Sequence, residues 1–115
     1  MEKFYTSLGL MSGTSMDGID ASIIRSNGEN NYEPIFDKYF EYDEVIYSDL
    51  LNLRDKIYSI KDLKANSYQI NELERKITLF HAKISKEIIK NAGVDVDIVG
   101  FHGQTIFHNA QEKIS

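Results

Sequence analysis

Residues able to bind a phosphate group lie together near the start of the chain, in the run GLMSGTSMDGID at residues 9–20. Strand-like apolar segments flank this run, so it is predicted to form the turn of a β-hairpin. Glycines allow positive φ and close approach of a ligand, and the backbone N–H groups of such a turn can bind an anion. Asp17 and Asp20 would repel a phosphate and therefore imply a hard cation beside it, most often Mg²⁺. This pattern indicates nucleotide-dependent phosphoryl transfer.

Three other functional motifs do not fit this run. It is not a P-loop, because no Gly-Lys-Ser/Thr ends it and no helix follows directly. Its glycine spacing does not fit the dinucleotide-binding pattern G-x-G-x-x-G. Residues 13–16 are similar to the nucleophile region of subtilisin-like proteases, but Asp17 and Gly18 follow where small residues and a proline would be expected. An ordinary hairpin turn explains the local pattern equally well.

Composition excludes several classes of partner. A chain of 115 residues forms one domain at most, or a piece of one. Its net charge of −5 argues against binding to nucleic acid or to an anionic membrane. There is no cysteine, so disulfides and thiolate metal sites are excluded. No secretory signal and no apolar stretch of about 18 residues is present. We therefore expect a soluble, cytoplasmic protein.

The predicted elements place the first run at one end of a small sheet. Strands are expected over residues 4–11, 21–25 and 35–42, with Pro34 at the start of the third, where a missing N–H costs least. An Asn-Gly turn at residues 27–28 joins the second strand to the third. These strands make an antiparallel meander before any helix begins.

Two helices and a buried strand are expected next. Asp43 is a candidate N-cap for a first helix with apolar residues up to Ile57. A longer helix is predicted from Asn66, with Gln69 as capping-box partner, to Gly93 at the C′ position. Its apolar stripe comprises Ile70, Leu73, Ile77, Phe80, Ile84 and Ile88.

A second polar run ends the strand that is predicted after the long helix. Val94, Val96, Ile98 and Phe101 suggest a buried strand, and the run GFHGQT at residues 100–105 closes it. Ile106 and Phe107 resemble the start of another strand, which gives the order β-β-β-α-α-β-β. Polar groups at the C-terminal end of a buried strand lie where α/β sheets place their ligand contacts.

This order resembles the start of one half of the actin, sugar-kinase and heat-shock ATPase superfamily, whose fold is ribonuclease H-like. Residues 9–20 and the run GFHGQTIFH at residues 100–108 resemble the two N-terminal signatures of the anhydro-N-acetylmuramic acid kinase family. The resemblance covers the whole chain but only the first part of the family's length. It implies an α/β fold with a mixed sheet, and a single partial domain over residues 1–115 that is the N-terminal part of a bilobal sugar kinase.

The resemblance also implies a reaction. Family members use ATP and Mg²⁺ to phosphorylate 1,6-anhydro-N-acetylmuramic acid, opening the anhydro ring with water to give N-acetylmuramic acid 6-phosphate in peptidoglycan recycling. The expected partners are this small sugar and ATP, with either a second copy of the chain or a missing C-terminal lobe. The general base is expected in the missing part, so no catalytic residue is assigned here and the chain alone is predicted to be inactive. The alternative is a non-catalytic remnant that serves as a binding or assembly module.

Site residues follow from the match to these two signatures. The ATP and phosphate contacts are assigned to Gly13, Thr14, Ser15, Met16, Asp17, Gly18, Ile19 and Asp20. Within this set Asp17 is the candidate for the Mg²⁺ side, through water, whereas Asp20 could equally be a solvated turn residue. Contacts in the substrate or phosphate cleft are assigned to His102, Gly103, Gln104 and Thr105, against the alternative of a structural turn. His81 lies mid-helix and is interpreted as structural or surface.

Overall fold

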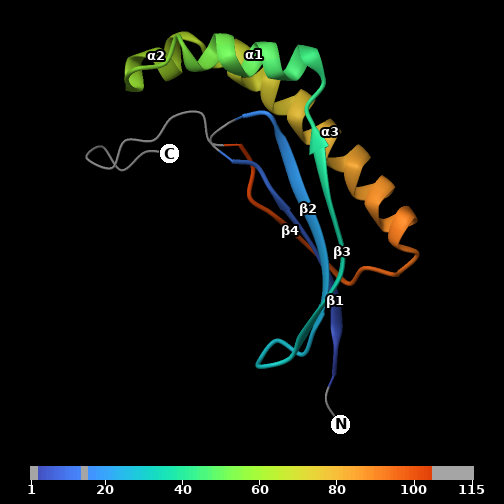
Figure 1. Ribbon diagram of the computed structural model, residues 1–115. Coiled ribbons are helices and arrows are strands. Elements are labelled where there is room, and N and C mark those ends of the chain that lie inside the picture. The colour runs from blue at the N-terminus through green and yellow to red at the C-terminus, as the bar shows by residue number, and fades with distance from the viewer. Residues whose placement is uncertain (1–2, 14–15, 105–115) are drawn as a thin grey trace.

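The computed structural model describes residues 3–13 and 16–104, which form a four-stranded sheet with helices gathered on one side of it (Figure 1). The elements are β1 (Tyr5–Met11), β2 (Gly18–Ser26), β3 (Tyr32–Glu41), α1 (Glu44–Arg54), α2 (Ile60–Ala65), α3 (Ser67–Ala92) and β4 (Ile98–Phe101). The strand order is β3-β2-β1-β4, antiparallel throughout except for the parallel pair β1 and β4. The predicted α/β class, with a mixed sheet and an antiparallel meander, is confirmed.

The third strand differs from its prediction at both ends. It begins at Tyr32, so Pro34 lies inside β3 and not at its start. Pro34 pairs with Ile24 directly beside a register shift between Ile23 and Ile24. A proline removes a ladder hydrogen bond and is tolerated on an outer strand or at a bulge, and here both conditions hold.

One hydrophobic core joins the helices to the face of the sheet that they cover. Side chains alternate along each strand, so every second residue of β1 and β2 points into this core. Its fully buried members include Leu8, Ile19, Ile23, Leu50, Ile84 and Ile88. The predicted stripe on α3 is confirmed, with Leu73, Ile77, Ile84 and Ile88 buried and with Ile70 and Phe80 half-buried against the core.

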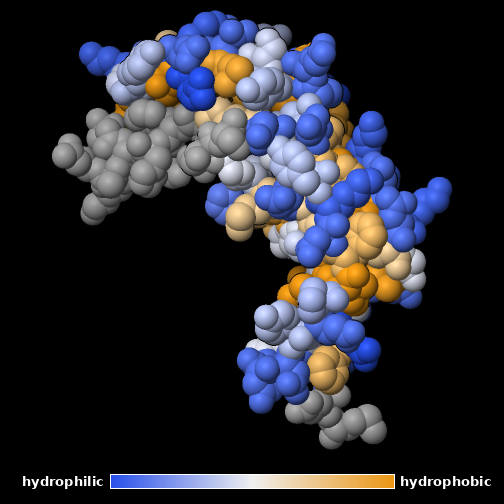
Figure 2. Space-filling view, viewed as in Figure 1, coloured by the Kyte–Doolittle hydropathy of each residue, from blue (hydrophilic) through white to orange (hydrophobic). Residues whose placement is uncertain are grey.

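The fourth strand is exposed, and the prediction of a buried strand is wrong for this chain. All four residues of β4 are exposed, with Phe101 at 57%. In the described part of the chain β4 is the outer strand beside β1, so the other edge of β4 is unpaired. The apolar side chains of β4 are only partly covered. Val94 and Val96, expected in this strand, are half-buried in the preceding loop. Figure 2 shows a band of hydrophobic side chains in the region where this loop joins α3 to the sheet.

The first two helices show one confirmed cap and one element that was not expected. Asp43 caps α1, because its Oδ1 accepts a hydrogen bond of 2.9 Å from the Ile46 N–H. Ile57 is buried but follows the end of the helix. The short helix α2 was not predicted, since six residues are too few to display a helical period. No helix within residues 3–13 and 16–104 is long and apolar enough to cross a membrane.

The long helix α3 begins and ends where predicted, but the contacts at its N-terminal cap differ. Gly93 adopts the left-handed conformation with φ of 67° and closes the helix, as expected of a C′ glycine. The capping box is wrong, because the Asn66 side chain makes no cap hydrogen bond and instead donates to the Asp62 carbonyl. Gln69 turns toward α1, where its Oε1 accepts a hydrogen bond of 3.4 Å from Lys56 Nζ.

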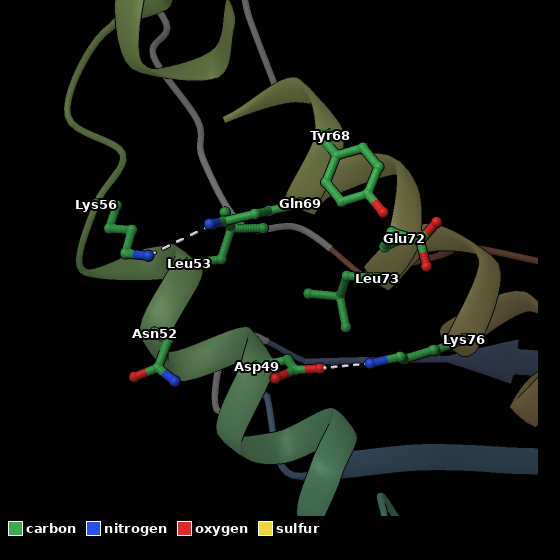
Figure 3. A pocket seen from close by; sticks show the side chains of 9 residues that line it. All are labelled: Asp49, Asn52, Leu53, Lys56, Tyr68, Gln69, Glu72, Leu73 and Lys76. Atoms are coloured by element: carbon green, nitrogen blue, oxygen red, sulfur yellow. Dashed lines mark hydrogen bonds and ion pairs between the residues drawn. The ribbon is translucent and has the colours of Figure 1, made fainter. Parts of the chain in front are cut away.

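Side chains from α1 and α3 enclose a shallow pocket of about 300 Å³ (Figure 3). Leu53 and Leu73 are buried beneath it, and Lys76 forms an ion pair of 2.9 Å with Asp49 across it. Lys76 thus joins α3 to α1, and Lys56 joins the segment after α1 to α3 through Gln69. No residue of either signature lines this pocket.

His81 on α3 is buried in the core, at 4% exposure. Its Nδ1 lies 2.8 Å from the Ile77 carbonyl oxygen and must carry the proton, because a carbonyl can only accept. Its ring meets that of Phe101 edge to face at 4.5 Å. Nε2 has no hydrogen-bond partner among the residues that the structure describes. Burial accordingly lowers the pKa of His81, while the hydrogen bond to Ile77 opposes this shift.

We expect the chain to lose stability as pH falls below about 6.5, the ordinary pKa of histidine. The unfolded chain binds a proton at His81 more readily than the folded chain, so the contribution is present above this pH and is lost as pH falls through the lowered folded value. Thermal unfolding between pH 5 and pH 8 measures it, with His81→Leu as the comparison. An equally steep loss in His81→Leu would show that other groups cause the dependence.

Candidate functional site

Met16, in the turn between β1 and β2, has a strained backbone conformation. Met16 is buried and has a φ of 60°, and its N–H donates to the Gly13 carbonyl at 3.2 Å. A left-handed conformation at a residue other than glycine costs about 1–3 kcal/mol and persists only where the surroundings enforce it. Such strain concentrates at ligand sites. Positive φ, which the glycines of this run would allow, falls on Met16.

Gly18 opens β2, and its lack of a side chain is required by packing. A Cβ at this position would lie 2.5 Å from Tyr39 Oη and nearer still to the Phe40 carbonyl oxygen. The residue is buried between these groups of β3. Gly18 therefore permits the tyrosine to reach across the sheet toward the turn, a role distinct from the predicted phosphate contact.

Tyr39 carries its hydroxyl to the carboxylate of Asp17, to which it donates a hydrogen bond. Desolvation of the phenol is the first cause that raises its pKa to about 12, followed by this hydrogen bond and by the charges of Asp17, Glu41 and Asp20. Tyr39 is 44% exposed, so the pair lies at the surface. The tyrosine stays protonated at neutral pH and orients the Asp17 carboxylate.

Asp20 lies inside β2, opposite Tyr39, and not in the turn. It lines a hollow of about 510 Å³ beside both signatures, together with Gly9, Leu10, Met11, Ser22, Gly100, Phe101 and His102. Ile19 precedes it with a fully buried side chain, which cannot contact a ligand at the turn. Thr14, Ser15 and Thr105 lie outside the described residues.

The second signature begins within β4, which runs parallel to β1, so the C-terminal ends of both strands lie at the same end of the sheet. The His102 N–H extends the ladder by donating to the Leu10 carbonyl at 3.1 Å. Gly103 has a φ of 82°, a conformation that favours glycine. His102 Nδ1 donates to the Gly103 carbonyl at 3.0 Å and is therefore protonated. This sharp turn directs Gln104 back toward the first signature.

Gln104 connects the two signatures directly. Its Nε2 donates to the Gly13 carbonyl at 2.9 Å, across 91 positions of sequence. Its Oε1 accepts from Tyr42 Oη at 3.2 Å, and Tyr42 Oη lies 3.0 Å from Ser12 Oγ. Within the described residues, the fold thus brings Ser12 and Gly13 together with residues 102–104 in one polar site at the C-terminal ends of β1 and β4.

Comparison with known proteins assigns the family. The family model for "Anhydro-N-acetylmuramic acid kinase" matches residues 5–115. The chain belongs to this family. An anhydro-N-acetylmuramic acid kinase of Pelagibacter ubique (strain HTCC1062) is 93% identical over the whole chain, which covers 31% of that protein. Those of Agrobacterium fabrum and Brucella canis are 36% and 33% identical over 100% and 94% of the chain, covering 32% and 30% of each.

The chain thus spans about a third of the length of these curated members of the anhydro-N-acetylmuramic acid kinase family. Its topology is consistent with the N-terminal segment of an ATPase-like kinase fold, and the recognition of the family from the two signatures is confirmed. The roles of the individual site residues stay predictions.

Three residues of the site were missed by reasoning from the sequence. Ser12 stands inside the first signature but was not singled out. Tyr39 lies near the end of β3 and Tyr42 directly after it, with no motif around them. A usable signal existed in the meander itself, because the end of a third antiparallel strand lies beside the start of the second. Tyrosines placed there can reach the turn that precedes the second strand.

The carboxylate at the turn fits a magnesium ion that is held largely by water and phosphate. Within the described ranges, no three histidine or acidic side chains gather as a ready metal cluster. Mg²⁺ does not need one, because it retains several waters and is bound by one or two carboxylates together with substrate phosphates. Asp17 is an exposed carboxylate oriented by Tyr39, and its role toward magnesium stays a prediction.

Proposed function

We propose that this chain forms the phosphate-binding part of a kinase that uses ATP to phosphorylate 1,6-anhydro-N-acetylmuramic acid and opens the anhydro ring to give N-acetylmuramic acid 6-phosphate. The observation that carries the proposal is the hydrogen bond from Gln104 to the Gly13 carbonyl. It brings two sequence signatures of one kinase family together at the edge of the sheet where a ligand binds in α/β folds.

In this proposal the turn holds the terminal phosphates of ATP. Its backbone N–H groups supply neutral donors, while the Gly13 carbonyl is directed toward Gln104 and Met16. The Asp17 carboxylate would bind the magnesium ion through a water molecule. When bound, Mg²⁺ neutralises charge on the transferred phosphoryl group. His102 and Gly103 present a polar edge to the sugar beside the hollow.

The proposed reaction conserves atoms as follows. Water attacks the anomeric carbon, the bond from this carbon to O6 breaks, and O6 takes the γ-phosphoryl group from ATP. ADP leaves, and the proton of the water passes to a general base. Catalysis of this kind depends on positioning and on electrostatic stabilisation more than on covalent chemistry. The residues assigned in this chain contribute to positioning, in the part of the site that holds the phosphates.

A full-length chimera tests the proposal. In it, this chain replaces the matching N-terminal portion of the Pelagibacter ubique kinase, with which it is 93% identical. We expect ATP- and magnesium-dependent release of ADP with the anhydro sugar. The product mass should exceed that of the sugar by one water and one phosphoryl group. N-acetylglucosamine, which has no anhydro ring, serves as the control substrate.

The unaltered Pelagibacter ubique kinase is the matched control protein. Turnover by this control but none by a folded chimera would contradict the proposed function. That result would favour the alternative of a non-catalytic binding or assembly module. The exposed apolar strand β4 provides such a module with a surface for a partner.

A further inference from the structure

Tyr42 lies directly after β3 and contacts both sides of the turn between β1 and β2. Its backbone N–H donates to the Asp17 carbonyl at 2.9 Å, on the side that enters β2. Its hydroxyl meets Ser12 at 3.0 Å, on the side that leaves β1. A single residue of the meander therefore holds the two flanks of residues 13–16.

The polar side chains around Tyr42 form a continuous chain of hydrogen bonds. A phenol has one proton, and Tyr42 gives it to Gln104 Oε1 at 3.2 Å, so Ser12 Oγ must donate to Tyr42 Oη. The amide of Gln104 then donates through Nε2 to the Gly13 carbonyl at 2.9 Å. Gly13 follows Ser12 in sequence, so the chain closes on itself at the turn.

Burial gives this arrangement its rigidity. Tyr42 is 6% exposed, and its ring packs on that of Phe80 in α3 at 5.4 Å between centroids. Desolvation raises the pKa of Tyr42, and the hydrogen bond from Ser12 opposes the rise, so the hydroxyl keeps the proton that it donates. In a buried network each member depends on its neighbours, because an unpaired polar group in a low dielectric is costly.

The Gly13 carbonyl is the group that this network orients. It accepts from Gln104 Nε2 at 2.9 Å and from the Met16 N–H at 3.2 Å, which occupies both of its lone pairs. A carbonyl oxygen is the negative end of the peptide dipole and would repel a phosphate. Holding it against Gln104 and Met16 keeps that oxygen away from the ligand.

We propose that Tyr42 and Gln104 are positioning residues that fix the conformation of the turn between β1 and β2, with Tyr42 acting through the amide of Gln104. The inference rests on the proposed function for its kinetic consequence only. It gives Gln104 a role other than the predicted contact with substrate or phosphate. The two signatures then act as one unit, in which the second shapes the first.

The test uses Tyr42→Phe and Gln104→Met in the full-length chimera. Phenylalanine keeps the ring against Phe80 and removes the hydroxyl alone. We expect kcat/KM for ATP to fall about tenfold, equivalent to about 1.4 kcal/mol, with KM for the sugar unchanged. The double variant should be no worse than the poorer single variant, because both changes break one chain. Tyr58→Phe makes the same chemical change at an exposed site and should leave the rate unchanged.

A second measurement separates this inference from the proposed function. Amide hydrogen exchange of a peptide spanning residues 9–20 should speed up several-fold in both variants, while exchange in α1 stays as in the parent. This readout needs no turnover and stands if the parent chimera is inactive. Unchanged exchange at the turn in a folded Gln104→Met protein would overturn the inference. A raised KM for the sugar, with the turn unaffected, would instead return Gln104 to a substrate contact.

Discussion

Replacing Gly18 with alanine is expected to lower the free energy of unfolding by about 1–3 kcal/mol, the usual cost of overpacking. The same change should reduce kcat/KM for ATP about 100-fold, since a shift of about 1 Å at a reacting group can cost that much. The new methyl group would meet both the Phe40 carbonyl and the Tyr39 hydroxyl. The tyrosine can rotate away but the backbone carbonyl cannot, so the start of β2 and the turn before it must move. Urea denaturation and steady-state kinetics of the full-length chimera measure the two effects.

Gly9→Ala is the matched control for this prediction. Gly9 also lies in a strand, and a Cβ there would meet the Ser22 carbonyl at 4.0 Å, an ordinary contact. We expect it to change stability and rate far less than Gly18→Ala does. Equal effects of the two substitutions would show that loss of glycine itself, and not the crowding beside β3, is responsible.

The sequence predicted those features of the fold that depend only on residues close together in the chain. The Asp43 cap, the Gly93 terminus and the apolar stripe of α3 each follow from residue type and spacing along one element. The capping box at Asn66 failed because the Asn66 side chain donates to the Asp62 carbonyl and Gln69 accepts from Lys56. A sequence pattern does not show which of several possible partners such a side chain takes.

The exposure of β4 was unpredictable for a related reason. Its apolar residues are typical of a strand that is covered on both faces. Within the described chain, however, all four are exposed, and β4 is an outer strand beside β1. The site shows the same limit. Both signatures were recognised from their residues, whereas Tyr39 and Tyr42 reach the turn only because β3 lies along β2. Strained geometry also fell on Met16, where no rule based on glycine would place it.

Asp17→Asn is expected to reduce kcat/KM for ATP by about 10–100-fold, the range typical of groups that support a metal through a second shell. Asparagine keeps the shape of the side chain and an oxygen that can accept from Tyr39, but it removes the negative charge. Folding should be nearly unaffected because the residue is exposed. The pKa of Tyr39 should fall from about 12, since the substitution removes the Asp17 charge that helps to raise it. Kinetics at graded magnesium concentrations and tyrosine titration by absorbance measure these changes.

Three further variants identify which property of Asp17 matters. Asp37→Asn removes an exposed carboxylate from the same strand as Tyr39 and should leave the rate unchanged. Tyr39→Phe leaves the Asp17 charge in place and removes only the donor that orients it, so it should cost less than Asp17→Asn. Asp20→Asn tests the second carboxylate of the signature, which lies in β2 beside the hollow. If Asp20→Asn lowered the rate and Asp17→Asn did not, Asp20 would be the carboxylate that binds magnesium. The Asp17–Tyr39 pair would then only stabilise the start of β2 against β3.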